Sequence, residues 1–290
     1  MRKHHLQLYL LLTPYLLGLA LLVFVPMLMT VALSFTQYDI FSPPRWIGLA
    51  NYQHFFVDVN FQRALFNSLW YTVCTVTLRV AGALLLALLL NRNGRAIELA
   101  RTTIYLPTII PEVAIALVWL LILNPGYGPL NLALGALGVP PVPWLQTELG
   151  ARAALVVMSA FELGEGFVLL LAALQTIPPE LLEAAALDGA NRAQRFTRLI
   201  LPLLAPALLL LAFRDTALSF QDSFVPGLIT TETGPYYATY FLPHYMFNES
   251  FGLFKYGYGS AITVVMYLVS ALLVVGQFRA AGGQSVVDEN

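Results

Sequence analysis

Long apolar runs alternate with short polar segments along this chain. Six of the runs reach the roughly 20 residues that an α-helix needs to cross the hydrocarbon core of a bilayer. They lie near residues 7–35, 64–90, 103–123, 153–174, 199–222 and 257–278. The pattern therefore predicts an all-α, polytopic membrane protein with six transmembrane helices.

The composition agrees with insertion into a membrane. Of the 290 residues, 58% are hydrophobic and 11% are charged, whereas about 25% are charged in a typical soluble domain. A net charge of -1 provides no excess of basic residues for binding nucleic acid. The single cysteine, Cys74, cannot form an internal disulfide, and the four scattered histidines do not predict a metal site.

The first apolar run is typical of an uncleaved signal anchor. It follows Arg2 and Lys3, contains no charged residue before Asp39, and is longer than the apolar region of a cleaved signal peptide. We therefore expect three parts in the chain. Residues 1–63 form the anchor helix and first outer loop, residues 64–279 form a transmembrane domain, and residues 280–290 form a disordered polar tail.

The distribution of Lys and Arg predicts the orientation. With the N-terminus inside, nine of these residues face the cytoplasm, namely Arg2, Lys3, Arg92, Arg95, Arg101, Arg192, Arg195, Arg198 and Arg279. The four facing outward are Arg45, Arg63, Arg152 and Lys255. Because positive residues concentrate on the cytoplasmic side, both termini are predicted to be cytoplasmic. The segment at residues 178–206, called here the 178–206 loop, then lies on the inner side.

The first half of the 178–206 loop has the features of a short helix. Pro178 and Pro179 precede Glu180 and Glu183. Proline is tolerated in a first helical turn, and carboxylates there interact favourably with the positive end of the helix dipole. The alanines that follow are good helix formers.

The second half predicts a turn and another helix. Gly189 can adopt the positive φ that a sharp turn requires. Asn191, followed three residues later by Gln194, predicts a capping box at the start of the second helix. Leu201-Pro202 is expected to end that helix, because the residue before proline disfavours the helical conformation. From these features alone, an interfacial helix whose arginines contact lipid headgroups and a docking surface for a partner are equally open.

The order of residues in the loop resembles the EAA loop of the membrane subunits of binding-protein-dependent ABC importers. The matching positions are Glu183, Ala184, Ala185, Asp188, Gly189, Ala190, Phe196, Leu201 and Pro202. Shorter matches to the carbohydrate-uptake branch, which includes maltose- and glycerol-phosphate-type permeases, extend from about residue 45 to 278. Examples are Tyr105-Leu-Pro107, Gly126 to Asn131 and Gly257-Tyr-Gly-Ser-Ala261.

This resemblance implies a type I importer fold and a set of partners. The chain would pair with a second, different permease subunit in a heterodimer that shares the pathway, and with two ATP-binding cassette subunits and an extracytoplasmic solute-binding protein. The matching loop residues would couple the permease to the ATPase, with the helix from Glu180 to Leu187 in a cleft that closes on ATP binding. Glu183 would contact a basic residue of the ATPase.

The chain itself has no nucleotide-binding loop. Its only lysines are Lys3 and Lys255, and neither follows a glycine, so a phosphate-cradling Gly-Lys-Ser/Thr motif is absent. The chain is therefore predicted to be a transporter subunit and not an enzyme. It needs no cofactor of its own, because ATP is expected to bind the partner subunit.

Charged residues within the apolar runs are the candidates for a substrate site. They are Arg79, Glu112, Glu162, Glu165, Arg214, Asp215 and Asp222. An ionisable side chain at membrane depth costs roughly 2.5 to 3.5 kcal/mol on insertion scales and normally faces protein or water, so we expect them in the interior. One interpretation is internal pairing, for instance of Arg214 with a glutamate. The other is a polar pocket whose carboxylates accept hydrogen bonds from sugar hydroxyls.

Within that second interpretation, two groups of residues are predicted to bind substrate. Glu162 and Glu165 are three apart and therefore share one helix face. By the family resemblance, the substrate-contacting part of the fifth run adds the residues Phe220, Gln221, Asp222 and Phe224. The branch often has a small or apolar residue where Glu165 stands, so this position departs from its pattern.

The sequence thus predicts a permease subunit of an ATP-driven importer in a bacterial or archaeal inner membrane. Its substrate is predicted to be a neutral mono- or oligosaccharide, because interior carboxylates repel an anionic ligand. An ion- or proton-coupled secondary carrier is the alternative, but such a carrier has no need of an inner docking helix. A membrane-embedded enzyme would need a catalytic set that the sequence does not contain.

Overall fold

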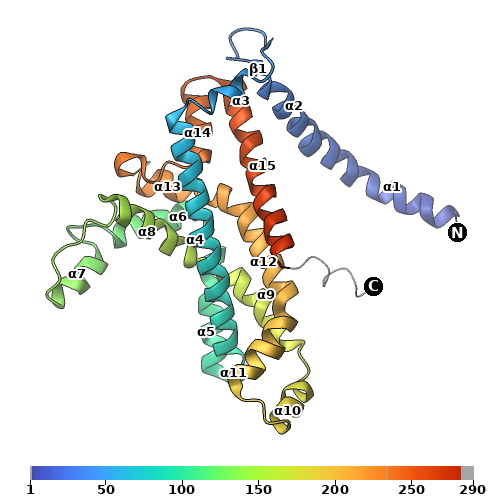
Figure 1. Ribbon diagram of the computed structural model, residues 1–290, viewed down its shortest axis with the longest axis vertical. Coiled ribbons are helices and arrows are strands. Elements are labelled where there is room, and N and C mark those ends of the chain that lie inside the picture. The colour runs from blue at the N-terminus through green and yellow to red at the C-terminus, as the bar shows by residue number, and fades with distance from the viewer. Residues whose placement is uncertain (1, 233, 282–290) are drawn as a thin grey trace. The chain divides into compact units, whose positions relative to one another are not determined.

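The computed structural model describes residues 2–232 and 234–281, with side chains from Leu11 onward. The described residues are mostly helical, and their two strands are two residues long each (Figure 1). The all-α prediction is confirmed. Two compact units are present: one comprises the chain up to Gln62 together with Leu242–Leu268, and the other comprises Arg63–Phe241 and the chain from Val269 onward. Most of the predicted tail, residues 282–290, lies outside the described residues.

The first unit begins with a long helical run and continues with short elements. Its elements are α1 (Arg2–Leu19), the π-helix η1 (Ala20–Phe24), α2 (Val25–Ser34), β1 (Thr36–Gln37), β2 (Arg45–Trp46), α3 (Ala50–His54), α14 (Leu242–Phe247), the π-helix η5 (Asn248–Gly252), and the adjoining ends of α4 (Val59–Leu90) and α15 (Tyr256–Ala280). The strands pair antiparallel, with Thr36 opposite Trp46. No side chain in the most apolar window of Leu11–Ser34 is buried inside the structure. Such an all-round apolar surface suits contact with lipid.

Asp58 holds the first unit together. Its carboxylate accepts hydrogen bonds from the hydroxyls of Tyr245 and Tyr258 and from the backbone N–H groups of Asn60 and Phe61, at 3.0 and 3.1 Å for the two N–H groups. Burial raises the pKa of Asp58, but the hydrogen bonds outweigh burial and hold the pKa below its usual value. Asp58 therefore links the start of α4 to α14 and α15 as a carboxylate.

The second unit contains the rest of the helices. They are α5 (Arg95–Tyr105), the 3₁₀-helix η2 (Leu106–Ile109), α6 (Glu112–Ile122), α7 (Pro129–Ala136), α8 (Glu148–Ala160), α9 (Gly164–Gln175), α10 (Pro179–Leu187), α11 (Arg192–Arg195), the π-helix η3 (Phe196–Ile200), α12 (Leu201–Asp222), α13 (Phe224–Thr230) and the 3₁₀-helix η4 (Pro235–Tyr237). Its main core is formed by α4, α9 and α12, through residues that include Ala83, Phe167 and Leu211. Gly166 permits this packing, because a Cβ there would lie 2.9 Å from a methyl carbon of Leu211.

Four helical stretches of the described residues are long and apolar enough to cross a membrane, and two bent helix pairs raise the number to six. The four are Leu11–Ser34, Val59–Leu90, Arg192–Thr230 and Tyr256–Ala280. The third predicted run is divided between α5–η2 and α6, which meet at 105°, and the fourth between α8 and α9, which meet at 46°. Pro107 lies in η2 and Pro111 in the break that follows it, and proline removes a helix donor and restricts the preceding residue.

The helix that follows the 178–206 loop corrects one prediction. Leu201-Pro202 does not end it, since the run from Arg192 to Thr230 is 39 residues long. The π-helix η3 directly precedes Pro202, and the N–H of Leu201 reaches the carbonyl of Phe196, five residues back. The wider π turn shifts the hydrogen-bond ladder just where proline lacks a donor. The same arrangement recurs in the first unit, where η1 precedes Pro26.

Candidate functional site

The 178–206 loop folds as the predicted helix, turn and helix. α10 ends in a Schellman motif around Gly189, whose φ is +84°. The N–H of Ala190 donates to the carbonyl of Ala185 at 2.9 Å, and the N–H of Gly189 donates to the carbonyl of Ala186 at 3.1 Å. A Cβ at Gly189 would meet nothing within 4 Å, so only the backbone conformation demands glycine there.

The second helix starts with the predicted capping box. The N–H of Gln194 donates to the side chain of Asn191 at 2.9 Å, and the N–H of Asn191 donates to the side chain of Gln194 at 2.8 Å. α11 then continues through η3 into α12. Because hydrogen bonds fix both ends of the turn, the direction of α10 relative to the long helix is restricted. Figure 1 shows α10 and α11 at the same end of the second unit as α5.

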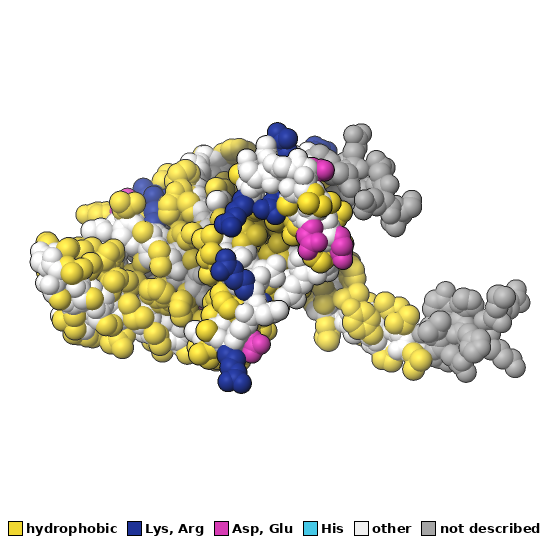
Figure 2. Space-filling view, turned by 90° about the horizontal axis from the view of Figure 1, so that it is seen from below, with side chains coloured by type: hydrophobic (Ala, Val, Ile, Leu, Met, Phe, Trp, Pro, Cys, Tyr) yellow, Lys and Arg dark blue, Asp and Glu magenta, His cyan; other side chains and the backbone are white. Residues whose placement is uncertain are grey.

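The exposed surface of α10 in the 178–206 loop carries both apolar and acidic side chains. Leu187 is 90% exposed and Leu181 is 45% exposed, and Glu183 and Ala184 are also exposed. Exposed leucines on a charged helix are typical of a surface that another protein or a membrane covers. Figure 2 looks onto this end of the second unit, where basic side chains are spread over the surface and acidic ones gather in smaller groups.

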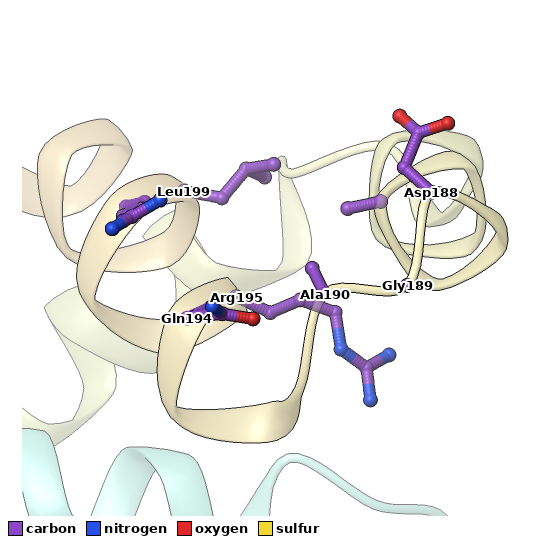
Figure 3. Close-up of a pocket in the computed structure, with 8 residues that line it drawn as sticks. Asp188, Gly189, Ala190, Gln194, Arg195 and Leu199 are labelled. Carbon is purple, nitrogen blue, oxygen red and sulfur yellow. The ribbon is translucent and has the colours of Figure 1, made fainter.

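The loop also forms an open surface cavity of about 370 Å³, lined by residues that include Ala185, Asp188, Gly189 and Arg195. Figure 3 shows Arg195 extending from α11 towards the Gly189 turn, while the carboxylate of Asp188 points away from it. Of the remaining predicted loop residues, Phe196 and Leu201 are half-buried and Pro202 is exposed in the continuous helix.

A second site lies inside the second unit, where charged residues from five segments line a cavity of about 230 Å³. The charged lining residues are Arg79, Glu112, Glu162, Glu165, Arg214 and Asp222. The cavity therefore has four carboxylates against two guanidinium groups. The structure brings these six charges to one cavity, although Glu165 is exposed, and Asp215 is 2% exposed and pairs with both arginines. Within the described residues, no group of three or more His, Cys, Asp or Glu is arranged to hold a metal ion.

The two arginines are paired. Arg79 Nη1 lies 3.2 Å from Asp222 Oδ2, and Arg79 Nε lies 3.8 Å from Asp215 Oδ2. Arg214 forms an ion pair with Glu165 and lies 3.5 Å from Asp215. The internal pairing of Arg214 with a glutamate is thus present, and it coexists with an open cavity.

The predicted substrate residues divide into two groups. Glu162, Glu165 and Asp222 line the cavity, whereas Phe220 is 2% exposed and packed in the interior. Gln221 is exposed and Phe224 is half-buried, and neither contributes to the lining.

Three charged lining residues, Arg79, Glu112 and Arg214, were not predicted to bind substrate, although their charge at membrane depth signalled an interior position. Arg79 faces the cavity from α4, and Glu112 enters it because α6 begins immediately after the break that follows η2. Only the 105° bend between η2 and α6 decides where Glu112 lies.

Membrane-crossing helices around a charged cavity, with an exposed helical loop at one end, define a membrane transport component. Residues 79–281 match the family described as the binding-protein-dependent transport system inner membrane component. The chain belongs to this family and is a permease component of an ABC importer. Its relatives are transport proteins and not enzymes, and membership of the family decides against the secondary carrier.

Curated relatives match the chain over almost its whole length. It is 34% identical to the "Probable ABC transporter permease protein YesP" of Bacillus subtilis, over 97% of the chain and 92% of that protein. It is 32% identical to the trehalose/maltose transport system permease protein MalF of Thermococcus litoralis, over 93% and 94%. It is 31% identical to the sn-glycerol-3-phosphate transport system permease protein UgpA of Agrobacterium fabrum, over 93% of each.

The fold has a close counterpart among solved structures. A chain of a bacterial ABC transporter involved in importing the acidic polysaccharide alginate superposes with a TM-score of 0.84, at 24% identity, over 98% of this chain and 97% of that one. The predicted type I importer permease fold is confirmed.

Proposed function

We propose that the chain forms part of the translocation pathway for a neutral mono- or oligosaccharide, which an extracytoplasmic solute-binding protein hands over. The observation that carries this proposal is the excess of carboxylates in the 230 Å³ cavity lined by Arg79 and Asp222, called here the central cavity. It has four carboxylates against two guanidinium groups. Carboxylate oxygens accept hydrogen bonds from hydroxyls, and like charges disfavour an anion in the same space. Relatives named for trehalose and maltose transport support a sugar as the substrate class.

Within the cavity, Glu162 and Asp222 are the acceptors that we assign to sugar hydroxyls. Arg79 holds Asp222 in place at 3.2 Å, and Arg214 holds Glu165. Phe220, which is buried close to Asp222, and Phe224 would shape this part of α12 and α13 by packing. Gln221 would contact the substrate from the exposed side of α12. The two ion pairs thus hold Asp222 and Glu165 in position and leave the cavity open.

The 178–206 loop is proposed to dock on an ATP-binding cassette subunit. Leu181 and Leu187 would enter an apolar groove of that subunit, and Glu183 would meet a basic residue. Because the helix is continuous, a movement of the loop would pass along it from Arg192 to Asp222. The 30 residues between them span about 45 Å.

This assignment extends to the assembly. The chain would pair with a second, different permease subunit, two ATP-binding cassette subunits and the solute-binding protein, and ATP would bind only the cassettes. Docking requires the loop to be cytoplasmic, which places both termini on the cytoplasmic side, in agreement with the distribution of Lys and Arg.

The docking is tested by Leu187→Glu. At 90% exposure the substitution leaves the fold intact, yet it places a charge in the proposed apolar contact. We expect the ATPase subunits to be lost from the purified complex. Leu137→Glu is the matched control, since Leu137 is 79% exposed but follows α7. Equal retention of the ATPase by both variants would remove the docking role from α10.

The substrate class is tested by uptake in proteoliposomes with trehalose, maltose, maltotriose and sn-glycerol-3-phosphate. The wild type should import at least one neutral sugar and exclude the phosphate ester. Asp222→Ala and Glu162→Ala should each reduce sugar uptake, whereas Glu98→Ala, at an exposed position of α5, should not. Selectivity that is unchanged in both cavity variants would refute the assignment.

A further inference from the structure

A third cavity lies at the N-terminal end of the part of α4 that belongs to the second unit. Its volume is about 540 Å³, and it is formed by α4, α8 and η4. The lining residues used below are Arg63, Asn67, Glu148, Arg152, Tyr236 and Tyr237. The central cavity does not share any of them.

Buried polar groups fix the shape of this cavity. Asn67 is 1% exposed, and its amide donates to the carbonyls of Tyr237 and Tyr240 at 2.8 and 3.2 Å. Arg152 donates to Asn67 Oδ1 at 2.9 Å and to the carbonyl of Ala238 at 3.1 Å. A satisfied network of this kind makes a rigid support. The turn at residues 237–240 is therefore clamped to α4 and α8.

Two tyrosines at the start of the clamped turn, one in it and one directly before it, have an unusual conformation. Tyr236 and Tyr237 have φ values of +53° and +60°, a region that bulky residues rarely adopt. The two residues are nevertheless 83% and 48% exposed, so burial does not hold them there; the Tyr237 ring also contacts the Tyr240 ring, with 5.4 Å between their centroids. Strained residues that a surrounding network over-determines are concentrated at binding sites.

The groups around these rings have complementary hydrogen-bonding chemistry. Arg63 and the tyrosine hydroxyls can donate, and Glu148 can accept, while each ring offers an apolar face. A sugar has the matching features, namely a weakly polar ring face surrounded by hydroxyls that both donate and accept. A concave site with apolar surface and a few convergent polar groups is the usual form of a small-ligand site.

We propose that this cavity is a second saccharide-binding subsite, in which Tyr236 and Tyr237 pack on a sugar ring while Arg63 and Glu148 bind its hydroxyls. The inference rests on the proposed transport of a sugar. Asn67 and Arg79 are 12 residues apart on α4, so the subsite lies about 18 Å along that helix from the central cavity. The 178–206 loop is at the opposite end of the unit, where Leu90 at the end of α4 and Ile200 pack on one core cluster. A sugar therefore meets this subsite before the central one.

The test removes the rings and keeps the backbone. The double variant Tyr236→Asn/Tyr237→Asn suits the purpose, because asparagine tolerates positive φ. Tyr236→Phe/Tyr237→Phe retains the rings, and Tyr127→Asn is the matched control at a 64% exposed tyrosine outside the cavity. Binding of labelled trehalose, maltose and maltotriose to the assembled complex in nanodiscs is measured without the solute-binding protein. Uptake and the affinity for the solute-binding protein are measured separately.

We expect the double asparagine variant to bind the imported sugar about tenfold more weakly, which corresponds to about 1.4 kcal/mol. The phenylalanine variant and Tyr127→Asn should stay within about twofold of the wild type. If the wild type imports sugar and the double asparagine variant binds sugar as tightly as the wild type, this subsite alone is overturned. Loss of affinity for the solute-binding protein with intact sugar binding would identify a protein-docking surface instead and also overturn it. A wild type that imports no sugar of the panel would refute the proposed function together with the subsite.

Discussion

Gly189 offers the sharpest test of the 178–206 loop, because its environment isolates a single physical term. Its φ of +84° strains any L-residue, but a Cβ would meet nothing within 4 Å. A substitution therefore changes the backbone energy of the turn without creating a steric clash. For an ordinary residue this left-handed conformation costs roughly 1–2 kcal/mol, whereas asparagine adopts it more readily.

The penalty translates into a measurable loss. A cost of 1–2 kcal/mol lowers the population of the docked turn by about 5- to 30-fold. Gly189→Ala should weaken the affinity of the ATPase subunits for the permease within this range and reduce the sugar imported per ATP hydrolysed. Gly189→Asn should be milder, and Gly189→Val should be the most damaging because β-branched residues avoid positive φ.

The assay is ATPase binding and coupled uptake with the complex in nanodiscs and proteoliposomes. Gly135→Ala serves as the control, because Gly135 also has open space around it but no positive φ. If alanine, asparagine and valine at Gly189 all behave like the wild type, the Schellman turn does not set the docking angle. If all three are equally damaging, a contact of the glycine itself matters and the backbone argument is wrong.

Three further predictions concern stability, each measured by thermal unfolding of the purified protein in detergent. Gly257→Ala should be strongly destabilising, because a Cβ would lie 2.0 Å from the backbone oxygen of Thr36. The control, Gly276→Ala in the same helix, meets nothing and should be neutral or stabilising by up to about 1 kcal/mol. Similar effects at both positions would contradict the packing. Arg79→Ala should lower the free energy of unfolding by about 3–5 kcal/mol, because Asp215 and Asp222 lose this partner. Arg95→Ala, at an exposed position, should not change stability. An unchanged unfolding temperature for Arg79→Ala would show that the ion pairs are not needed. The pKa of Asp58 is lowered in the folded state, so its contribution to stability is present above the usual carboxyl pKa of about 3.9 and is lost as the pH falls through the lower folded value. Asp58→Asn should therefore be less stable than the wild type near neutral pH and lose less stability on acidification. Parallel pH profiles of the two proteins would refute this role.

Much of the fold followed from local patterns in the chain. Apolar runs located the membrane-crossing segments, because the thickness of the bilayer sets their length. The capping box at Asn191 and Gln194 and the turn at Gly189 were predictable, because each depends on residues only a few positions apart. The same locality failed at Leu201-Pro202, where the π-helix η3 absorbs a proline that by itself predicts a helix end.

The sites depended on longer-range structure to different degrees. The sequence by itself determined the helix, turn and helix of the 178–206 loop and the presence of charges within the apolar runs, since a charge at membrane depth must face protein or water. Only the tertiary structure decided which charges share a cavity, because Arg79, Glu112 and Asp222 come from helices whose relative positions depend on breaks and packing. It likewise placed Phe220 in the interior and brought Asn67 under the strained tyrosines. Separations of more than a hundred residues, such as that between Asn67 and Tyr237, leave no local pattern, and only the packed helices bring such residues together.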